Sequence, residues 1–107
     1  MSYNIIPTPN FQKEFKKLNK KYSSIKADLI ELGKSIAENP TQGNEVFKNC
    51  YKIRFVIKSK GKGKSGGARL ITYVQIVNER VYLLSIYDKS DKETVSDDFL
   101  KKLLKDL

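Results

Sequence analysis

Three consecutive segments decide the fold: YKIRFVI (residues 51–57), the loop KSKGKGKSGG (residues 58–67) and ARLITYVQIV (residues 68–77). In the first segment, apolar side chains alternate with Lys52 and Arg54, which is the two-residue period of a β-strand whose faces differ. The glycines of the middle segment are typical of a loop. The stretch therefore predicts two antiparallel strands, joined by a basic glycine loop, with one core face and one cationic face.

Positive charge is concentrated in the same stretch. No acidic residue lies between Glu45 and Glu79, whereas this interval holds eight basic residues: Lys48, Lys52, Arg54, Lys58, Lys60, Lys62, Lys64 and Arg69. Subtracting these eight charges from the net charge of +9 leaves +1 for the remainder of the chain. Because cations at this density repel one another unless a polyanion lies against them, the stretch predicts a nucleic acid as the partner.

Composition restricts the chemistry that is open to the chain. Its 107 residues predict one domain, residues 1–107, around a single core. No apolar run approaches the length of a membrane-spanning helix or signal sequence, so we expect a cytoplasmic protein without membrane association. Cys50 is the only cysteine and histidine is absent, which excludes a disulfide framework and histidine-dependent catalysis. We therefore expect no metal and no other cofactor, and proton transfer must rest on Lys, Arg, Tyr, Asp or Glu.

The N-terminal part predicts a strand followed by two helices. Residues 3–7 are β-prone and end at a proline. Thr8 followed by Pro9 predicts the start of a helix, and apolar residues then recur at helical spacing: Phe11, Phe15, Leu18 and Tyr22. A second helix begins at Ser23 or Ser24, ends at Asn39-Pro40 and repeats this spacing with Ile25, Leu29, Leu32 and Ile36. The short connection predicts that the helices pack as an antiparallel hairpin over a shared core.

The remaining chain predicts a sheet and a terminal helix. Residues 39–45 form a connector, and strands follow at residues 50–57, 69–77 and 81–87, with a turn at residues 78–80. In the last strand, simple alternation puts Leu84 and Ile86 on one face and Ser85 and Tyr87 on the other. Ser96, or alternatively Ser90, caps a short helix. The predicted class is α+β: two N-terminal helices packed on a twisted antiparallel sheet, with a short C-terminal helix.

The simplest strand register collects a candidate site on one face of this sheet. It consists of Lys52, Arg54, Lys58, Arg69, Tyr73, Tyr87 and Lys89. Basic side chains held on a sheet can grip phosphates, and tyrosines beside them can stack on bases. Ordinary strand packing is the alternative for the two tyrosines, and a solvated hairpin tip is the alternative for the loop lysines. A Walker-type phosphate loop does not fit, because Lys58 replaces its first glycine and a strand follows the loop.

At these residues the sequence resembles the RelE superfamily of bacterial toxins, in its RelE and HigB-like branches. Tyr51-Lys52-Ile53-Arg54 matches the strand pattern Tyr-Lys-Ile-basic, SKGKGKSGGAR (residues 59–69) matches the HigB-like loop, and YLLSIYDK (residues 82–89) matches the last strand. The resemblance weakens in the two N-terminal helices. It implies a toxin that enters the ribosomal A site and cuts messenger RNA without a metal, held inactive by a cognate antitoxin.

The resemblance also implies roles for individual residues. The phosphate-gripping positions carry over to Lys52, Arg54 and Arg69, and a later basic position carries over to Lys89. RelE itself has a tyrosine in its C-terminal segment, which this chain lacks, whereas HigB-like members have the last-strand tyrosine, here Tyr87. We therefore expect Arg69, Tyr87 and Lys89 to be catalytic, with Tyr87 or a loop lysine transferring protons. RNA binding is expected of Lys52, Arg54, Lys58, Lys60, Lys62, Lys64 and Tyr73.

Two chemical expectations accompany these roles. Surrounding positive charge should lower the pKa of a lysine or tyrosine, so that it can transfer protons at neutral pH. The antitoxin should carry an acidic contact segment or a helix-turn-helix, and contact with DNA should occur only through the toxin–antitoxin complex. Two other functions remain open: a ParE-like toxin that inhibits DNA gyrase, and a non-catalytic module that binds RNA or the ribosome.

Overall fold

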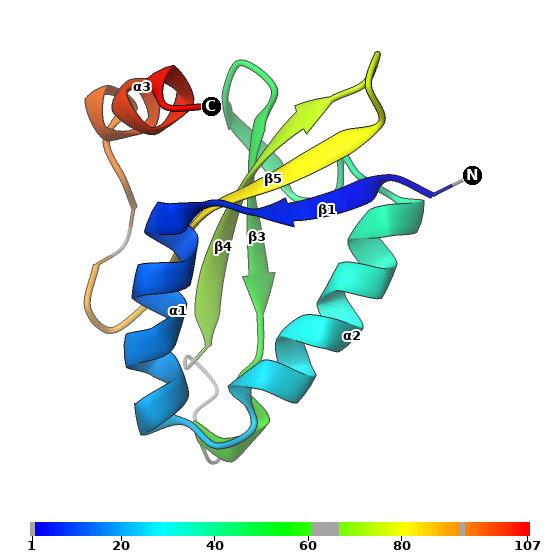
Figure 1. Ribbon diagram of the computed structural model, residues 1–107. Helices are drawn as coiled ribbons and strands as arrows, with labels where there is room; N and C mark the ends of the chain where they lie inside the picture. Colours follow the sequence, from blue (N-terminus) through cyan, green and yellow to red (C-terminus); the bar gives the residue numbers. More distant parts are fainter. Residues whose placement is uncertain (1, 61–66, 93) are drawn as a thin grey trace.

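A sheet with the strand order β1-β5-β4-β3-β2 forms the centre of the computed structural model (Figure 1). The structure describes residues 2–60, 67–92 and 94–107. In these residues the elements are β1 (Asn4–Pro7), α1 (Pro9–Lys21), α2 (Ile25–Glu38), β2 (Asn44–Phe47), β3 (Cys50–Phe55), the 3-10 turn η1 (Lys58–Lys60), β4 (Ala68–Gln75), β5 (Arg80–Asp88) and α3 (Asp97–Lys105). None of the described helices is both long and apolar enough to cross a membrane.

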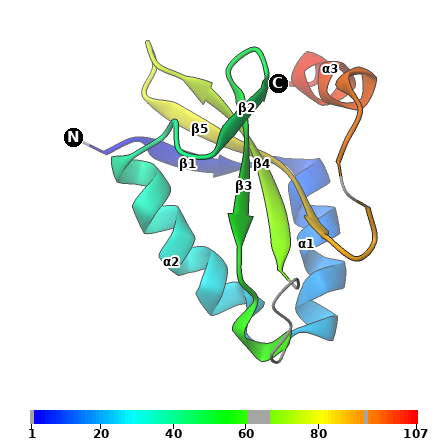
Figure 2. The ribbon, with the colours of Figure 1, turned by 180° about the vertical axis from the view of Figure 1, so that it is seen from behind.

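The helices cover the two faces of the sheet unequally. Apolar residues of α1 and α2 share one core cluster with Ile53, Leu70 and Ile86 of the sheet. Leu100 of α3 belongs to a second cluster, with Ile71 of β4 and Tyr87 of β5. Figures 1 and 2 show α1 and α2 running in opposite directions but diverging from their short connection. The expected helical hairpin is therefore splayed, because each helix buries its apolar stripe mainly against the sheet.

Side-chain caps begin α1 and α3 where the sequence predicts. Thr8 Oγ1 accepts a hydrogen bond from the Phe11 amide at 3.4 Å, and Pro9 occupies the first turn. Ser96 Oγ accepts from the Phe99 amide at 3.1 Å, so Ser96 and not Ser90 caps the last helix. Thr8 also donates to the Leu83 carbonyl at 2.8 Å, which fixes the start of α1 against β5.

The sheet differs from the prediction at its edges. β2 begins in the predicted connector, continues to Phe47 and pairs antiparallel with β3, while β1 pairs with β5 in parallel. Gly43, just before β2, has φ of 97°, and a Cβ there would lie 2.5 Å from the Lys52 carbonyl oxygen. This close backbone approach requires glycine. β3 ends at Phe55 and not at residue 57, and β4 ends at Gln75 and not at Val77, which is 93% exposed in a turn.

A β-bulge in β5 changes which face its side chains occupy. Ile71 pairs with Ser85 but Thr72 pairs with Leu83, so Leu84 is an extra residue between the two pairs. Leu84 joins Tyr87 in the cluster beside α3, whereas Ile86 joins the cluster beneath α1 and α2. The prediction that Leu84 and Ile86 share a face was wrong, because the bulge interrupts the alternation on which it depended.

Polar side chains of α1 serve the backbone at this bulge. Glu14 Oε1 accepts hydrogen bonds from the Ile86 amide at 3.1 Å and from the Ser85 hydroxyl at 2.7 Å. Asn10 Nδ2 donates to the Leu84 carbonyl at 2.9 Å and to Glu14 at 3.0 Å. Backbone groups that a bulge removes from the ladder need partners elsewhere, and α1 supplies them.

We therefore expect Glu14→Ala to destabilise the fold by about 2 kcal/mol, because the Ile86 amide and the Ser85 hydroxyl lose their acceptor. Urea unfolding followed by circular dichroism measures the change. Glu31→Ala is the matched control: Glu31 is an exposed glutamate on α2, and its loss should cost less than about 0.5 kcal/mol. Equal effects of the two substitutions would contradict the role assigned to Glu14.

Candidate functional site

Three of the predicted site residues lie side by side across the sheet. Arg54 of β3 pairs directly with Arg69 of β4, and Arg69 pairs directly with Tyr87 of β5. Their neighbours Ile53, Leu70 and Ile86 point into the cluster beneath α1 and α2, so the three side chains belong to the opposite face. We call Arg54, Arg69 and Tyr87 the cross-strand row. Lys52 lies on the same face two residues before Arg54 in β3, where it pairs with Ile71 of β4.

The two arginines of the cross-strand row have no acidic partner within ion-pair distance among the described residues. Arg69 is only 9% exposed, and its guanidinium donates to the Ala68 carbonyl at 3.2 Å. Within the described residues, the single ion pair of the protein joins Lys60 to Asp88, and neither arginine of the row takes part in it. Like charges placed directly opposite on adjacent strands repel each other. An anion such as a phosphate, held between the guanidinium groups, would relieve that repulsion.

Tyr87 of β5 is the third member of the row, and its phenol is buried. Its side chain is 4% exposed, and the Lys92 ammonium lies 5.5 Å from the centre of its ring. Burial raises the pKa of Tyr87, while the nearby charge of Arg69 acts in the lowering direction and only partly offsets it. The expectation of a lowered pKa for Tyr87 was therefore wrong, because the effect of burial exceeds that of the Arg69 charge. At neutral pH Tyr87 is a phenol, which suits it to donate a proton and not to remove one.

Lys92 is a neighbour of the row that sequence reasoning missed. Its ammonium lies between two aromatic rings, 5.5 Å from that of Tyr87 and 5.9 Å from that of Phe99 at the start of α3. Lys92 comes from the turn region after β5, where no strand period relates it to the sheet. Only the basic charge five residues beyond Tyr87 could have suggested it.

Backbone contacts hold Gly67, the last residue of the glycine loop, beside both Phe55 and Lys89. The Lys89 amide donates to the Gly67 carbonyl at 3.1 Å, so the segment after β5 stays beside the residue that precedes β4. A Cβ on Gly67 would lie 2.7 Å from the Phe55 carbonyl oxygen, which excludes larger residues there without a backbone shift. Lys89 is half-buried and follows Tyr87 by two residues. Lys62 and Lys64, also predicted to bind RNA, lie outside the described residues.

Tyr73 occupies the far end of the same face. It pairs with Cys50 on one side and Tyr82 on the other, and its ring stacks on that of Tyr82 at a centroid distance of 6.2 Å. Tyr73 lies four positions after Arg69 along β4, a distance of about 13 Å in an extended strand. Tyr73 thus packs in the cluster beside α3, away from the cross-strand row.

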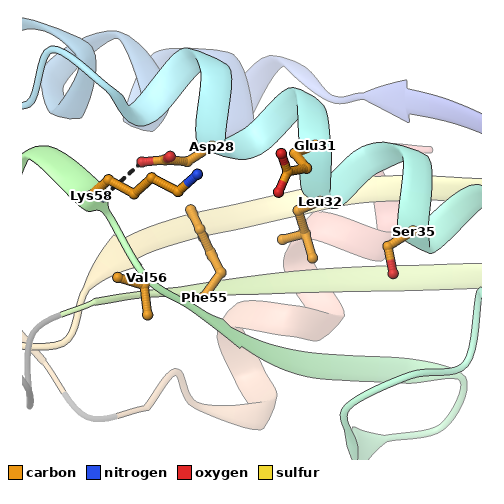
Figure 3. Close-up of a pocket in the computed structure, with 7 residues that line it drawn as sticks. All are labelled: Asp28, Glu31, Leu32, Ser35, Phe55, Val56 and Lys58. Atoms are coloured by element: carbon orange, nitrogen blue, oxygen red, sulfur yellow. Dashed lines mark hydrogen bonds between the residues drawn. The ribbon is translucent and has the colours of Figure 1, made fainter.

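Lys58 and Lys60 are not on the face where the arginines lie. The Lys58 amide donates to Asp28 Oδ2 at 2.9 Å, and its side chain extends beside α2 in a groove of about 310 Å³ (Figure 3). Lys60 Nζ donates to Asp88 Oδ1 at 2.6 Å and lies 5.8 Å from the ring centre of Tyr22, which is in α1's C-terminal cap. The prediction that Lys58 shares the face of Lys52 and Arg54 was wrong, because the strand period ends at Phe55.

Cys50 and the acidic groups offer no competing site in the described residues. Burial raises the pKa of the Cys50 thiol to about 11, with a further contribution from the charge of Glu45, so it is a poor nucleophile at neutral pH. No three Asp, Glu or Cys side chains of the described residues come together as metal ligands. The candidate site is therefore the cross-strand row with its neighbours Lys52, Lys89 and Lys92.

Comparison with known proteins supports the fold of a bacterial toxin. No protein-family model matches the chain. The structure of free Escherichia coli toxin RelE, with two arginines replaced by alanine, aligns with a TM-score of 0.63 and 17% identity over 100% of this chain and 99% of that chain. The same mutant in complex with an antitoxin RelBc peptide aligns with a TM-score of 0.60 and 20% identity, over 95% and 94%. The chain has the RelE fold, and the predicted α+β class is confirmed.

Acid should destabilise the protein through Asp88, whose side chain is fully buried. Burial alone would raise the pKa of Asp88, but hydrogen bonds from Lys60, Tyr22 and Ser90 outweigh it and hold this pKa well below the ordinary value of 3.8. Its contribution to stability is therefore complete above the ordinary value and is lost as the pH falls toward the lower pKa of the folded state.

Thermal melts at about pH 6 and pH 3 test this linkage. Asp88→Asn should be less stable than the wild type at the higher pH but should lose less stability on acidification, because asparagine does not titrate. If both proteins lose equal stability between the two pH values, Asp88 does not carry the linkage.

Proposed function

We propose that this chain is the toxin of a type II toxin–antitoxin module and that it cleaves messenger RNA on the ribosome without a metal. The observation that carries the proposal is that Arg54 and Arg69 pair directly across β3 and β4, and that Arg69 pairs in turn with the buried Tyr87 of β5. Likeness to RelE in fold, over nearly the full length of both chains, supports it.

The reaction is attack of a 2′-hydroxyl oxygen on the adjacent phosphorus, followed by loss of the 5′-oxygen. Arg69 and Arg54 hold the non-bridging oxygens and stabilise the charge that develops on them. Tyr87 donates its proton to the departing 5′-oxygen, in keeping with the raised pKa of its phenol. The proton of the 2′-hydroxyl passes to solvent water, while Lys52 binds the RNA backbone and Lys89 stabilises the charge of the transition state. The products are a 2′,3′-cyclic phosphate and a 5′-hydroxyl.

A cognate antitoxin is the expected protein partner. One of the similar structures is a RelE mutant in complex with a peptide of the antitoxin RelBc. For this chain we propose a partner with an acidic contact segment or a helix-turn-helix, with DNA bound only through the complex. The protein acts in the cytoplasm, where its proposed substrates, the ribosome and messenger RNA, are found.

Expression of the chain in growing bacteria tests the function directly. Induction without a partner should stop incorporation of labelled methionine within minutes, and primer extension should reveal cuts at codons of ribosome-bound messages. An arrest of thymidine incorporation with intact messages would point to a gyrase inhibitor, and translation arrest without cuts to a binding module. Normal growth at a high level of soluble protein would refute the toxin hypothesis.

Arg69 should be the most sensitive position for cleavage. A planar guanidinium contacts two phosphate oxygens at once, which an ammonium cannot reproduce, so Arg69→Lys should already slow cleavage. Arg69→Ala should lower the single-turnover rate on the order of a hundredfold or more, with little change in ribosome affinity. Arg80→Ala removes an exposed arginine at the other end of β5 and serves as the control. Equal, modest losses at both positions would make Arg69 one basic residue among many.

Tyr87→Phe tests the assignment of the proton donor. Loss of the hydroxyl should lower the cleavage rate about a hundredfold, the range of general acid catalysis, while melting temperature changes little. Tyr82→Phe, in the same strand but outside the row, should leave the rate unchanged. Single-turnover cleavage of a programmed ribosome measures both variants. Full activity of Tyr87→Phe would assign proton donation to another group.

A further inference from the structure

Asp88 is a buried carboxylate that the proposed reaction does not use. It is 0% exposed and accepts four hydrogen bonds. Tyr22 Oη donates to Oδ2 at 2.6 Å, and Lys60 Nζ donates to Oδ1 at 2.6 Å. The Ser90 amide and hydroxyl donate to Oδ1 at 3.0 and 2.9 Å. A buried charge with this many partners is costly to assemble and costly to disrupt.

These partners come from three separate parts of the chain. Tyr22 is the C-cap of α1, Lys60 ends η1 just before the first glycine of the loop, and Ser90 lies in the turn after β5. The Asp88 carboxylate at the end of β5 thus connects α1, η1 and the turn after β5. No other ion pair in the described part of the chain makes such a connection.

Asp88 is also adjacent to the cross-strand row through the backbone. It follows Tyr87 in β5 and pairs with Ala68, the residue before Arg69. Because successive side chains of a strand point to opposite faces, Tyr87 lies on the same face as Arg69, whereas Asp88 lies on the face that α1 covers. Any shift of Asp88 along or across the sheet therefore moves Tyr87 relative to Arg69.

We infer that Asp88 is a positioning residue for the proposed cleavage site, and that Lys60 serves this carboxylate instead of binding RNA. The ion pair between Lys60 and Asp88 fixes η1 against the end of β5, and this contact keeps Arg69 and Tyr87 aligned. This inference rests on the proposed function, since alignment matters only if the row acts on a substrate. Small displacements of catalytic groups have large effects on rate.

The charge environment of Lys60 agrees with this assignment. Its side chain is 19% exposed, and its ammonium is held at 2.6 Å from the carboxylate and 5.8 Å from the Tyr22 ring centre. Contact with an RNA phosphate would require breaking the ion pair and leaving the Asp88 charge buried without its cation. Lys52, in contrast, has no acidic partner within ion-pair distance in the described residues.

The experiment compares Lys60→Met, Asp88→Asn and the double variant K60M/D88N with the wild type. Each single substitution leaves one buried partner uncompensated and should lower the melting temperature. The double variant removes both charges and should melt within about 5 °C of the wild type. Its kcat for cleavage on programmed ribosomes should nonetheless be at least tenfold lower, with KM unchanged, because the connection between η1 and β5 is missing. A double variant that cleaves at the wild-type rate would overturn the inference.

Salt dependence separates positioning from RNA binding. Loss of a phosphate-contacting lysine should reduce the slope of log affinity against log salt by about 0.7 to 0.9. Lys52→Met should show this reduction, whereas Lys60→Met should leave the slope unchanged and lower kcat. Lys34→Met, an exposed lysine of α2, is the control for both measurements. If Lys60→Met reduces the slope as Lys52→Met does and preserves kcat, Lys60 is an RNA contact and the inference fails.

Two further measurements keep the test decisive. If the double variant does not fold, Tyr22→Phe removes one hydrogen bond from Asp88 and should lower kcat several-fold at constant KM; an unchanged kcat would overturn the inference. If the wild type cleaves no message, the proposed function fails, and nuclear magnetic resonance then tests the geometry alone. The amide signals of Arg69 and Tyr87 should shift in Tyr22→Phe but not in Lys34→Met, and unshifted signals would contradict a positioning role.

Discussion

The candidate site depends on one irregularity, the β-bulge at Leu84. Before the bulge, Val81 and Leu83 face the two N-terminal helices, and uninterrupted alternation would turn Tyr87 toward them as well. The extra residue reverses the alternation, so Tyr87 lies beside Arg69 and Asp88 faces α1 instead. Glu14 stabilises the bulge in the folded state, because its carboxylate accepts hydrogen bonds from the Ile86 amide and the Ser85 hydroxyl.

The sheet divides a cationic segment that is continuous in the sequence. Arg54 and Arg69 remain on the open part of the α3 side, where described residues offer no carboxylate within ion-pair distance. Lys60 passes to the other side and is neutralised by Asp88. Cations that are close together in the sequence thus have different surroundings in the fold. The arginines have no such carboxylate and are proposed to attract an anion, whereas Lys60 joins η1 to the end of β5.

Likeness to RelE establishes the fold of this chain, whereas its chemistry depends on individual side chains. The RelE fold extends over the whole chain although identity is only 17–20%, and a fold by itself does not define a function. Function belongs to particular side chains, and for this chain we propose the cross-strand row and its lysine neighbours. In the proposed reaction, the buried phenol of Tyr87 is the proton donor, and the paired arginines of β3 and β4 are the phosphate ligands.

The sequence by itself determined the helix starts at Thr8 and Ser96, the hairpin around the glycine loop and the basic face, because these depend on local capping and on a two-residue period. It also placed Arg54, Arg69 and Tyr87 together. Only the tertiary structure decided the bulge at Leu84, the pairing of Lys60 with Asp88 and the raised pKa of Tyr87. Each of these depends on burial and on contacts between residues far apart in the chain, which no local pattern records.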